Sequence, residues 1–350
     1  MFLLFFCYLC SMKYDVTIGI PVYNVEKYIR LTMDSVLAQS FENIEFLILD
    51  DCGSDSSMDI VRKYQNTHPR GKDIRIVRQP QNMGIGAARN RIVDEAQGRY
   101  LYFLDADDII ESHTIELLYD SARKFNAELV FGSYERIEEY NEEVKRVKKR
   151  YPNIQFTHDD AFADYVFLHY NRIEAMIWNI LIDIEVFRKN GICFKQINYL
   201  EDFIFTMDLP TYVTRVVLLS DITYYYYCRK GTLSQYGERD SIPKEEILQT
   251  MRAITQVKEN SERIMGKPYF SNRMLKVMKT CFYICCAILR NKNKINPCFE
   301  NRELRDLMRY TVRWSVVCSL RHLPLFIMGK LPSSLSVWLM FLLGKAKHLV

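Results

Sequence analysis

The sequence is poor in the residues that build fibrous or disordered chains. Only 13 of the 350 residues are Gly and 10 are Pro, which excludes a collagen-like repeat and a low-complexity linker. Hydrophobic residues make up 49% of the chain and charged residues 26%, a balance that indicates a globular protein long enough for two domains. The formal net charge is only +4, too small to indicate the strongly basic face of a nucleic-acid-binding protein.

Ten cysteines in a chain of this length do not form a disulfide scaffold. Cys7 and Cys10 make a C-x-x-C, but no second pair or histidine cluster follows at metal-binding spacing. We interpret the three cysteines at 281, 285 and 286 as small hydrophobic residues of a helix, and we expect a reduced, cytoplasmic protein.

Long hydrophobic runs are absent as well, because no uninterrupted apolar stretch reaches the ~20 residues of a membrane-spanning helix. Residues 1–11 are a short apolar run with no basic residues before it, and we expect translation to start at Met12, so that this run is annotation overhang. Near the C-terminus, apolar segments between Trp314 and Val350 are broken and closed by basic residues. Two interpretations stay open: helices that lie on an anionic membrane surface, or a helical subdomain that packs on the body.

Strand and helix signals alternate over the first hundred residues. We predict strands at 16–20, 45–49, 74–77 and 100–104, and helices at 26–38, 54–64 and 84–95. This order predicts βαβ units and an α/β fold: a Rossmann-like, mainly parallel sheet with helices on both faces. Pro21 is predicted to end the first strand. Further along we expect a solvated face or loop at the charge run 135–150, a helix ending at Gly191, a strand at 222–228, and helices from about 243 onward.

Polar residues follow three of these strands, at Tyr23-Asn24, Asp50-Asp51 and Asp105-Ala106-Asp107-Asp108. Ligands of open α/β sheets bind beyond the carboxyl ends of the strands, so three polar strand ends at that edge indicate a binding site. Mg²⁺ and Mn²⁺ take one or two carboxylates and fill their other positions with water and phosphate oxygens, so a D-x-D turn suits a metal bound to a diphosphate.

Two other phosphate-binding devices are missing. There is no G-x-x-x-x-G-K-[ST] loop and no G-x-G-x-x-G after the first strand, which argues against a P-loop NTPase and a Rossmann dehydrogenase. A divalent metal, rather than a glycine loop, would therefore neutralise the phosphates.

Together these segments make the chain resemble a family 2 glycosyltransferase, an inverting enzyme with the A-type nucleotide-sugar fold. The matching segments, in order, are Ile20–Asn24, Asp50–Ser57, Asn82–Gly84 with Ala88–Asn90, Asp105–Asp108, Trp178-Asn179 and Glu201-Asp202. The resemblance covers roughly residues 16 to 235. Ile180-Leu181-Ile182 departs from it, because many relatives carry a basic residue there, and Cys52 is a second departure.

The resemblance implies a role for each matching residue. Asp105 would lie by the ribose, Asp107 would bind the metal, and Asp202 would be the general base that deprotonates the acceptor hydroxyl. The nucleoside would be held by Pro21, Tyr23, Asn24 and Asp51, with Asp51 accepting the N–H of a uracil-type base. Arg89 would contact the donor's phosphate or sugar, and the acceptor side would include Trp178, Asn179, Glu201 and Arg229.

Structural roles compete with these assignments. Asp50 suits a turn, Glu201 a cap or ion pair, and Trp178 a core anchor. For Asp202, the neighbours Phe203, Ile204 and Phe205 predict an apolar setting, which would raise the pKa of the carboxyl and make it a stronger base.

The sequence therefore predicts three parts: overhang 1–11, a nucleotide-sugar domain 12–240, and a helical region 241–350 that contacts a membrane or packs on the domain. The predicted reaction moves a hexose with inversion from a UDP-sugar to a glycan or lipid-linked hydroxyl, helped by Mn²⁺ or Mg²⁺. We expect it in cell-surface polysaccharide or glycolipid synthesis at the inner membrane face. The alternatives are a non-catalytic assembly partner with the same fold and a metal-dependent nucleotidyltransferase.

Overall fold

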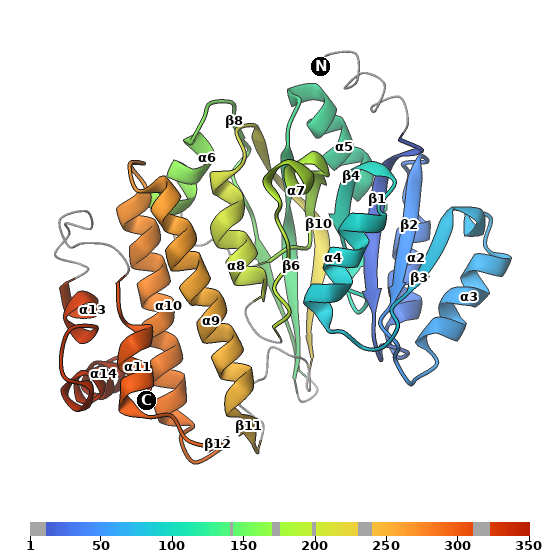
Figure 1. Cartoon of the computed structure of the whole chain (residues 1–350). Helices are drawn as coiled ribbons and strands as arrows, with labels where there is room; N and C mark the ends of the chain where they lie inside the picture. Colours follow the sequence, from blue (N-terminus) through green and yellow to red (C-terminus); the bar gives the residue numbers. More distant parts are fainter. Residues whose placement is uncertain (1–11, 141–142, 170–175, 198–200, 230–239, 311–322) are drawn as a thin grey trace. The chain divides into compact units, whose positions relative to one another are not determined.

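The structure is a computed structural model, and it describes residues 12–140, 143–169, 176–197, 201–229, 240–310 and 323–350 (Figure 1). The chain forms two compact units. Unit 1 comprises Met1–Phe162, Ala175–Gln196 and Leu209–Ser234, and unit 2 comprises Ala163–Glu174, Ile197–Asp208 and Gln235–Val350. The expected overhang 1–11 lies outside the described residues, and the predicted boundary near 240 stays a prediction.

Unit 1 is built on one mixed, mainly parallel sheet. Its strands lie in the order β3 (Ile74–Arg78), β2 (Ile44–Asp50), β1 (Tyr14–Val22), β4 (Gly98–Phe103), β9 (Ile180–Asp183), β6 (Leu129–Tyr140), β10 (Val216–Arg229) and β5 (Ile109–Ile110). The first four run parallel, and β9 is antiparallel to both β4 and β6. β1 and β2 are buried along most of their length, and their sequences are mainly apolar, with the buried polar residues Thr17 and Glu45 near their amino ends.

The connections of the parallel strands are helices that flank the sheet (Figure 1): α2 (Ile29–Leu37), α3 (Ser57–Thr67), α4 (Ile85–Glu95) and α5 (Thr114–Phe125). Close packing of α4 on the sheet depends on Gly19, since a Cβ there would lie 2.4 Å from Ile92 Cγ2. The predicted helix ending at Gly191 is α7 (Glu185–Asn190), and Gly191 closes it in the left-handed conformation with a φ of 59°.

Two of the predicted elements are wrong in detail. Pro21 does not end the first strand but pairs with Leu49 inside β1. This is tolerated because the pairing of β1 with β4 stops at Gly19, so no ladder bond is lost on that side. The helix expected from 26 begins at Ile29, and its N-cap residue is Tyr28.

The charge run 135–150 is not a loop. Its acidic half lies in β6 and its basic half in β7 (Glu143–Lys149), which pair antiparallel. Opposite charges meet across the strands, as in Arg146 with Glu135 at 3.3 Å and Lys145 with Glu138 at 3.7 Å. The change of sign along the run was the signal for two paired strands.

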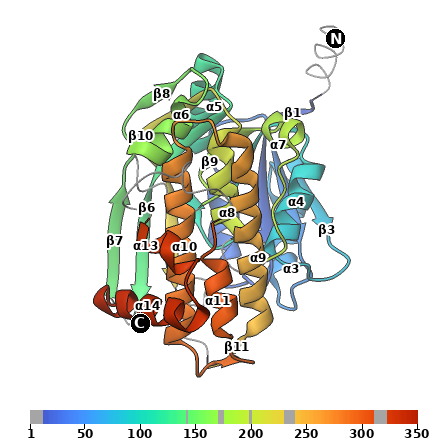
Figure 2. The same ribbon diagram turned by 60° about the vertical axis from the view of Figure 1, so that its left-hand side comes forward.

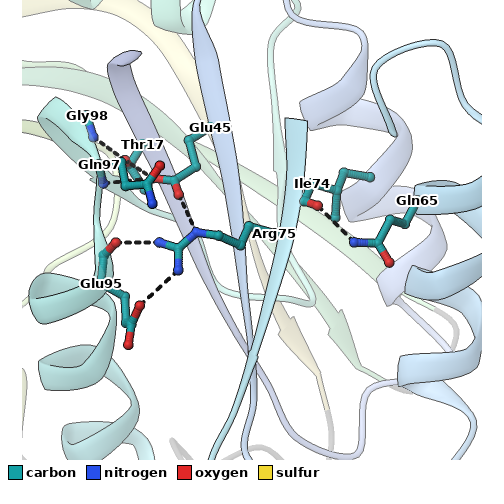
Figure 3. Close-up of polar contacts among 8 residues, drawn as sticks. All are labelled: Thr17, Glu45, Gln65, Ile74, Arg75, Glu95, Gln97 and Gly98. Carbon is teal, nitrogen blue, oxygen red and sulfur yellow. Dashed lines mark hydrogen bonds and ion pairs between the residues drawn. The ribbon is translucent and has the colours of Figure 1, made fainter. Parts of the chain in front are cut away.

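A polar cluster ties the amino ends of four strands together (Figure 3). The buried Glu45 carboxylate of β2 accepts bonds from Thr17 Oγ1 (2.6 Å), Arg75 Nε (2.7 Å) and the amide of Gln97 (2.9 Å). Arg75 also pairs with Glu95 at the end of α4. Every strand from β1 to β4 thus contributes to, or directly adjoins, one compensated charge cluster.

Unit 2 is helical, as predicted for the region after residue 243. It contains α8 (Glu201–Asp208), α9 (Lys244–Asn260), α10 (Phe270–Arg290), α11 (Asn301–Leu307), α13 (Leu323–Met328), α14 (Ser333–Ala346) and the short pair β11 (Ile242–Pro243) and β12 (Ile295–Asn296). The predicted apolar role of the cysteines at 281, 285 and 286 is confirmed, because all three are buried on α10. Two further short elements are β8 (Ile154–Phe156), in unit 1, and α6 (Ala161–Asp164).

A buried ion pair joins two helices of unit 2. Arg273 of α10 is fully buried and donates to the Asp208 carboxylate and the Met207 carbonyl at the end of α8. Asn260 adds a bond to the same carboxylate at 3.1 Å. No helix among the described residues is both long enough and apolar enough to cross a membrane.

Candidate functional site

The strand order changes direction at β1. The chain adds β2 and β3 on one side of this strand and then returns to add β4 on the other side. Such a switch point leaves a crevice beyond the carboxyl ends of the strands, where α/β proteins bind ligands. Tyr23, Asp51 and Asp105 follow the ends of β1, β2 and β4, so the structure brings the three predicted strand ends to this one place.

The loops after β1 and β2 are bonded to each other. Asn24 adopts a φ of 52°, and its Oδ1 accepts the Ser54 amide at 2.8 Å. A Cβ on Gly53 would lie 2.9 Å from Asn24 N and Oδ1, so the close approach requires glycine there. Pro21 is buried in β1, while the Tyr23 ring is 46% exposed and is available to a ligand.

Asp51 holds the loop that precedes α4. Its carboxylate accepts the amides of Met83 at 3.0 Å and Gly84 at 3.2 Å. Burial raises the pKa of this carboxyl, the two amide bonds oppose the rise, and the neighbouring Asp50 adds to it. A base contact by Asp51 stays a prediction, and the sequence did not show its bonds to the 83–84 loop.

Arg89 on α4 and Asp105 after β4 form an ion pair at 3.3 Å. The Arg89 guanidinium is almost completely buried and lies 5.8 Å from the ring centre of Phe194. A buried cation at the switch point is suited to an anionic ligand, which agrees with the predicted donor contact of Arg89.

Arg229 lies beside Asp107, although the two residues are far apart in the sequence. Its Nη1 donates to the Asp107 carbonyl at 2.7 Å and lies 3.6 Å from the carboxylate. Nε faces Glu139 at 3.3 Å, and the rings of Tyr28 and Tyr227 lie 4.2 and 4.3 Å from the guanidinium carbon. The guanidinium is therefore fixed against the D-x-D turn.

The D-x-D turn has a surplus of negative charge. Burial, followed by repulsion from Asp105, raises the pKa of Asp107 to about 6, and Arg229 offsets only part of this rise. The next carboxyl, Asp108, is buried, and its pKa is raised well above the ordinary value by burial and by Asp107 and Asp105. A cation bound here would remove an unfavourable interaction.

Asp108 has a structural task that the sequence analysis missed. It accepts the Tyr224 hydroxyl at 2.7 Å and the Tyr227 amide at 2.8 Å, so it fixes the D-x-D turn to β10. The sequence did contain a hint of this structural role, because the Asp105–Asp108 run has a third carboxylate beyond the two of the D-x-D pattern. Tyr28 and Glu139, which also contact Arg229, had no recognisable signal in the sequence.

Trp178 and Asn179 lie inside unit 1. The Trp178 indole is buried and stacks with the rings of Tyr224 and Tyr226, at ring-centre distances of 4.5 and 5.0 Å. Asn179 is fully buried; its amide donates to the Gly132 carbonyl, and its oxygen accepts the Tyr102 and Thr223 hydroxyls. These contacts give both residues a structural task, and their acceptor-side role stays a prediction.

Glu201 and Asp202 form the first turn of α8, in unit 2, and both are half-buried. Carboxylates at a helix N-terminus interact favourably with the helix dipole. The structure thus places the predicted base on a different unit from the D-x-D turn. Its role, and the raised pKa expected for it, stay predictions.

The predicted metal fits the D-x-D turn only as a metal shared with a ligand. No three His, Cys, Asp or Glu side chains among the described residues form a group that would hold a metal by themselves. Mg²⁺ and Mn²⁺ sites with one or two carboxylates, completed by phosphate oxygens and water, need no such group. The unbalanced charge around Asp107 and Asp105 agrees with that type of site.

The family described as "Glycosyl transferase family 2" matches the chain over residues 17–189, which include every strand end described above except that of β10. Residues 17–189 belong to glycosyl transferase family 2. The predicted resemblance is confirmed. The matched range ends before Glu201, Asp202 and Arg229, so the family assignment does not reach them.

The chain is also similar to several curated glycosyltransferases. It is 29% identical over 229 residues to the cholesterol galactosyltransferase of Borreliella burgdorferi, covering 63% of this chain and 62% of the relative. It is 42% identical over 93 residues to the putative teichuronic acid biosynthesis glycosyltransferase TuaG of Bacillus subtilis, covering 27% and 36%. In both cases the chain spans less than two thirds of the relative's length.

Solved structures confirm the fold. A crystal structure of S. aureus TarS 1-349 in complex with UDP-GlcNAc has a TM-score of 0.56 and 20% identity, covering 90% of this chain and 79% of that one. A second, in complex with UDP, has a TM-score of 0.58 and 18% identity, covering 95% and 91%. The predicted A-type fold, a mainly parallel sheet with surrounding helices and a helical C-terminal region, is therefore correct.

Proposed function

We propose that this chain is an inverting glycosyltransferase that moves a hexose from a UDP-sugar to a hydroxyl group. The observation that carries the proposal is the gathering of Tyr23, Asp51 and Asp105–Asp107 at the switch point of a family 2 sheet, with Arg89 and Arg229 fixed against the carboxylates. The complex of TarS, a protein of similar fold, with UDP-GlcNAc supports a UDP-sugar donor.

Unit 1 would bind the donor. Pro21, Tyr23, Asn24 and Asp51 would surround the nucleoside, Asp105 the ribose, and Arg89 the phosphates. Asp107 would hold Mn²⁺ or Mg²⁺ together with diphosphate oxygens, and when bound the metal would supply charge stabilisation to the leaving nucleotide. Arg229 keeps the D-x-D turn in position through its bonds to Asp107.

Inversion needs a base on the acceptor side. A hydroxyl attacks the anomeric carbon in line with the departing diphosphate, so the hydroxyl proton must pass to a group that is not on the diphosphate side. We assign this proton to the Asp202 carboxylate, with Trp178, Asn179, Glu201 and Arg229 on the acceptor side. Asp202 lies on α8 and Asp107 in the turn after β4, so the proposed base and the proposed metal ligand come from different elements.

The acceptor would be a glycan or a lipid-linked hydroxyl. The names of the relatives, a cholesterol galactosyltransferase and a teichuronic acid enzyme, support cell-surface glycolipid or polysaccharide synthesis. We place the protein in the cytoplasm at the inner face of the plasma membrane, with the C-terminal region in contact with the lipid.

The alternatives differ in what they need. A nucleotidyltransferase needs a basic activation loop near the first strand, and Pro21–Asn24 contains no basic residue. A non-catalytic assembly partner would keep the fold without turnover.

The test combines a donor screen with two neighbouring variants. Transfer or hydrolysis is measured across nucleotide sugars with Mn²⁺, and the active donor is then used with Asp202→Asn. Loss of a general base is expected to slow turnover by about 10²- to 10⁴-fold. UDP binding with metal, measured by calorimetry, should be unchanged.

Glu201→Gln is the matched comparison, because it removes one carboxylate from the same helix turn. Since we assign Glu201 to the acceptor side and not to proton transfer, this variant should raise the KM for the acceptor and leave kcat largely unchanged. Full turnover by Asp202→Asn would overturn the base assignment, and so would equal losses in both variants. A wild-type chain that binds UDP but turns over no donor would favour the assembly partner, whereas nucleotide transfer from a nucleoside triphosphate would favour the nucleotidyltransferase.

A further inference from the structure

The last helix of unit 2, α14, is apolar on its outer side. Its buried residues are Ser336, Met340 and Gly344, spaced four apart, which form one narrow stripe. Gly344 is packed so closely that a Cβ would lie 2.9 Å from the Cys286 sulfur of α10. Ser336 donates to the Met328 carbonyl of α13 at 2.7 Å. The stripe anchors the helix to the rest of unit 2, where Figure 2 shows α14 near α11 and α13.

The side away from this stripe carries large apolar residues. Trp338 is 56% exposed, and Leu335, Phe341 and Leu342 are between 40% and 45% exposed. Positions 335, 338 and 342 follow the i, i+3, i+7 spacing of a single helix face, and Phe341 lies beside Trp338 on it. We call these four residues the outer face of α14. Contiguous exposed apolar residues of this size mark an interaction surface.

Charge around the outer face indicates the kind of partner. The 44 residues from Leu307 to Val350 contain six Lys or Arg and no Asp or Glu. Lys330 before the helix and Lys345 and Lys347 at its end are all exposed, and Lys345 continues the line of Leu335, Trp338 and Leu342. An apolar helix face flanked only by cations fits the boundary between the headgroups and acyl chains of an anionic membrane.

We infer that α14 lies flat in the surface of an anionic lipid membrane, with its outer face in the acyl boundary and Lys330, Lys345 and Lys347 at the headgroups. A helix of 14 residues is about 21 Å long, too short to cross the bilayer but long enough to lie in its surface. This inference specifies the membrane contact of the proposed function. It does not depend on which sugar is transferred.

Vesicle sedimentation of the full chain tests the inference. The wild type should bind mixed phosphatidylcholine and phosphatidylglycerol vesicles and be released by salt. The double variant Trp338→Ser/Phe341→Ser should lower the partition coefficient by roughly a hundredfold, because two large apolar groups no longer enter the lipid. Replacing Lys330, Lys345 and Lys347 by Gln should lower it by roughly tenfold or more.

A matched control comes from unit 1, where Leu31 and Val144 are 54% and 59% exposed. Leu31→Ser/Val144→Ser removes two apolar side chains of similar exposure and should leave vesicle binding unchanged. Trp338→Phe should keep binding but lose the blue shift of tryptophan emission that anionic vesicles cause, because it removes only the reporter indole.

Several results would overturn the inference. These are no sedimentation of the wild type at low salt, equal binding to pure phosphatidylcholine, or equal loss in the control double variant. A wild-type dimer that Trp338→Ser/Phe341→Ser converts to monomer would assign the outer face to a second copy of the chain instead. UDP binding by the same variants is measured in parallel, so failure of the membrane contact is distinguished from failure of the proposed function.

Discussion

Buried carboxylates have different partners at the two ends of the unit 1 sheet. At the amino end, Glu45 is surrounded by donors from Thr17, Arg75 and Gln97, so its charge is compensated (Figure 3). At the carboxyl end, Asp105, Asp107 and Asp108 lie together, and the pKa of Asp107 is raised to about 6 by burial and by its neighbour. The amino end of the sheet thus holds a compensated charge, whereas the carboxyl end, where we propose the donor site, holds a surplus of carboxyl groups.

This difference teaches how a binding site is distinguished from a stabilising cluster. A buried charge with complete internal partners contributes to folding and leaves nothing for a ligand to satisfy. A group of carboxylates with an incomplete set of cations costs stability, and that cost is removed when a cation binds or when a carboxyl group takes up a proton.

The largest expected effect is on catalysis at the carboxyl end. If Asp107 holds the metal as we propose, Asp107→Asn should lower transfer by about a thousandfold, which corresponds to about 4 kcal/mol, because the metal would lose its carboxylate ligand. Initial rates over a range of Mn²⁺ concentrations measure this. Arg75→Met, at the other end of the sheet, should keep the wild-type rate per folded molecule. Equal losses of transfer rate in the two variants would contradict the proposal that only the carboxyl end of the sheet takes part in catalysis.

The next effect is on stability at the amino end. Arg75→Met should lower the free energy of unfolding by about 3 kcal/mol, since it leaves the buried Glu45 charge without its cation. Urea unfolding measures the change. The double variant Glu45→Gln/Arg75→Met should recover part of the lost stability, because it also removes the buried negative charge that has no cation. If the double variant were less stable than Arg75→Met, the uncompensated charge of Glu45 would not be the cause of the lost stability.

Removal of a charge at the carboxyl end should raise the stability, whereas Arg75→Met at the amino end lowers it. The pKa of Asp107 is about 6 in the folded chain and about 4 in an unfolded one, so the folded state holds its proton more tightly. Its contribution to stability is therefore present below pH ~4 and is lost as the pH rises through ~6.

In EDTA, Asp107→Asn should thus be about 2 kcal/mol more stable than the wild type at neutral pH, and the difference should vanish near pH ~4. Urea unfolding across this pH range measures it. A variant that is less stable than the wild type at neutral pH would show that the carboxylate is compensated after all.

The smallest effect concerns a single neutral bond at the amino end. Gln65 of α3 donates to the Ile74 carbonyl at the start of β3 at 2.9 Å (Figure 3). Gln65→Ala should cost about 1 kcal/mol of stability, the worth of one hydrogen bond, with no change in transfer rate. If Gln65→Ala lowered the free energy of unfolding as much as Arg75→Met does, compensation of the Glu45 charge would not explain the stability of the amino end.

Much of the chemistry could be predicted from local sequence. Asp51 and Asp105 each follow a β-rich apolar run, so their placement at strand ends needed only the alternation of strands and helices. The pairing of Arg229 with Asp107 could not be predicted, because it depends on β10 joining the sheet beyond β6. Likewise, nothing local in Asn179 indicates that its amide bridges β4, β6 and β10.

The sequence by itself determined the order of elements, the polar strand ends and the family of residues 17–189, because apolar periodicity and turn residues act over a few neighbouring positions. Only the tertiary structure decided which carboxylates are compensated, that the charge run is a pair of strands, and that one face of α14 stays exposed. These outcomes depend on contacts between residues far apart in the chain, where burial and neighbouring charges fix the energy of each group.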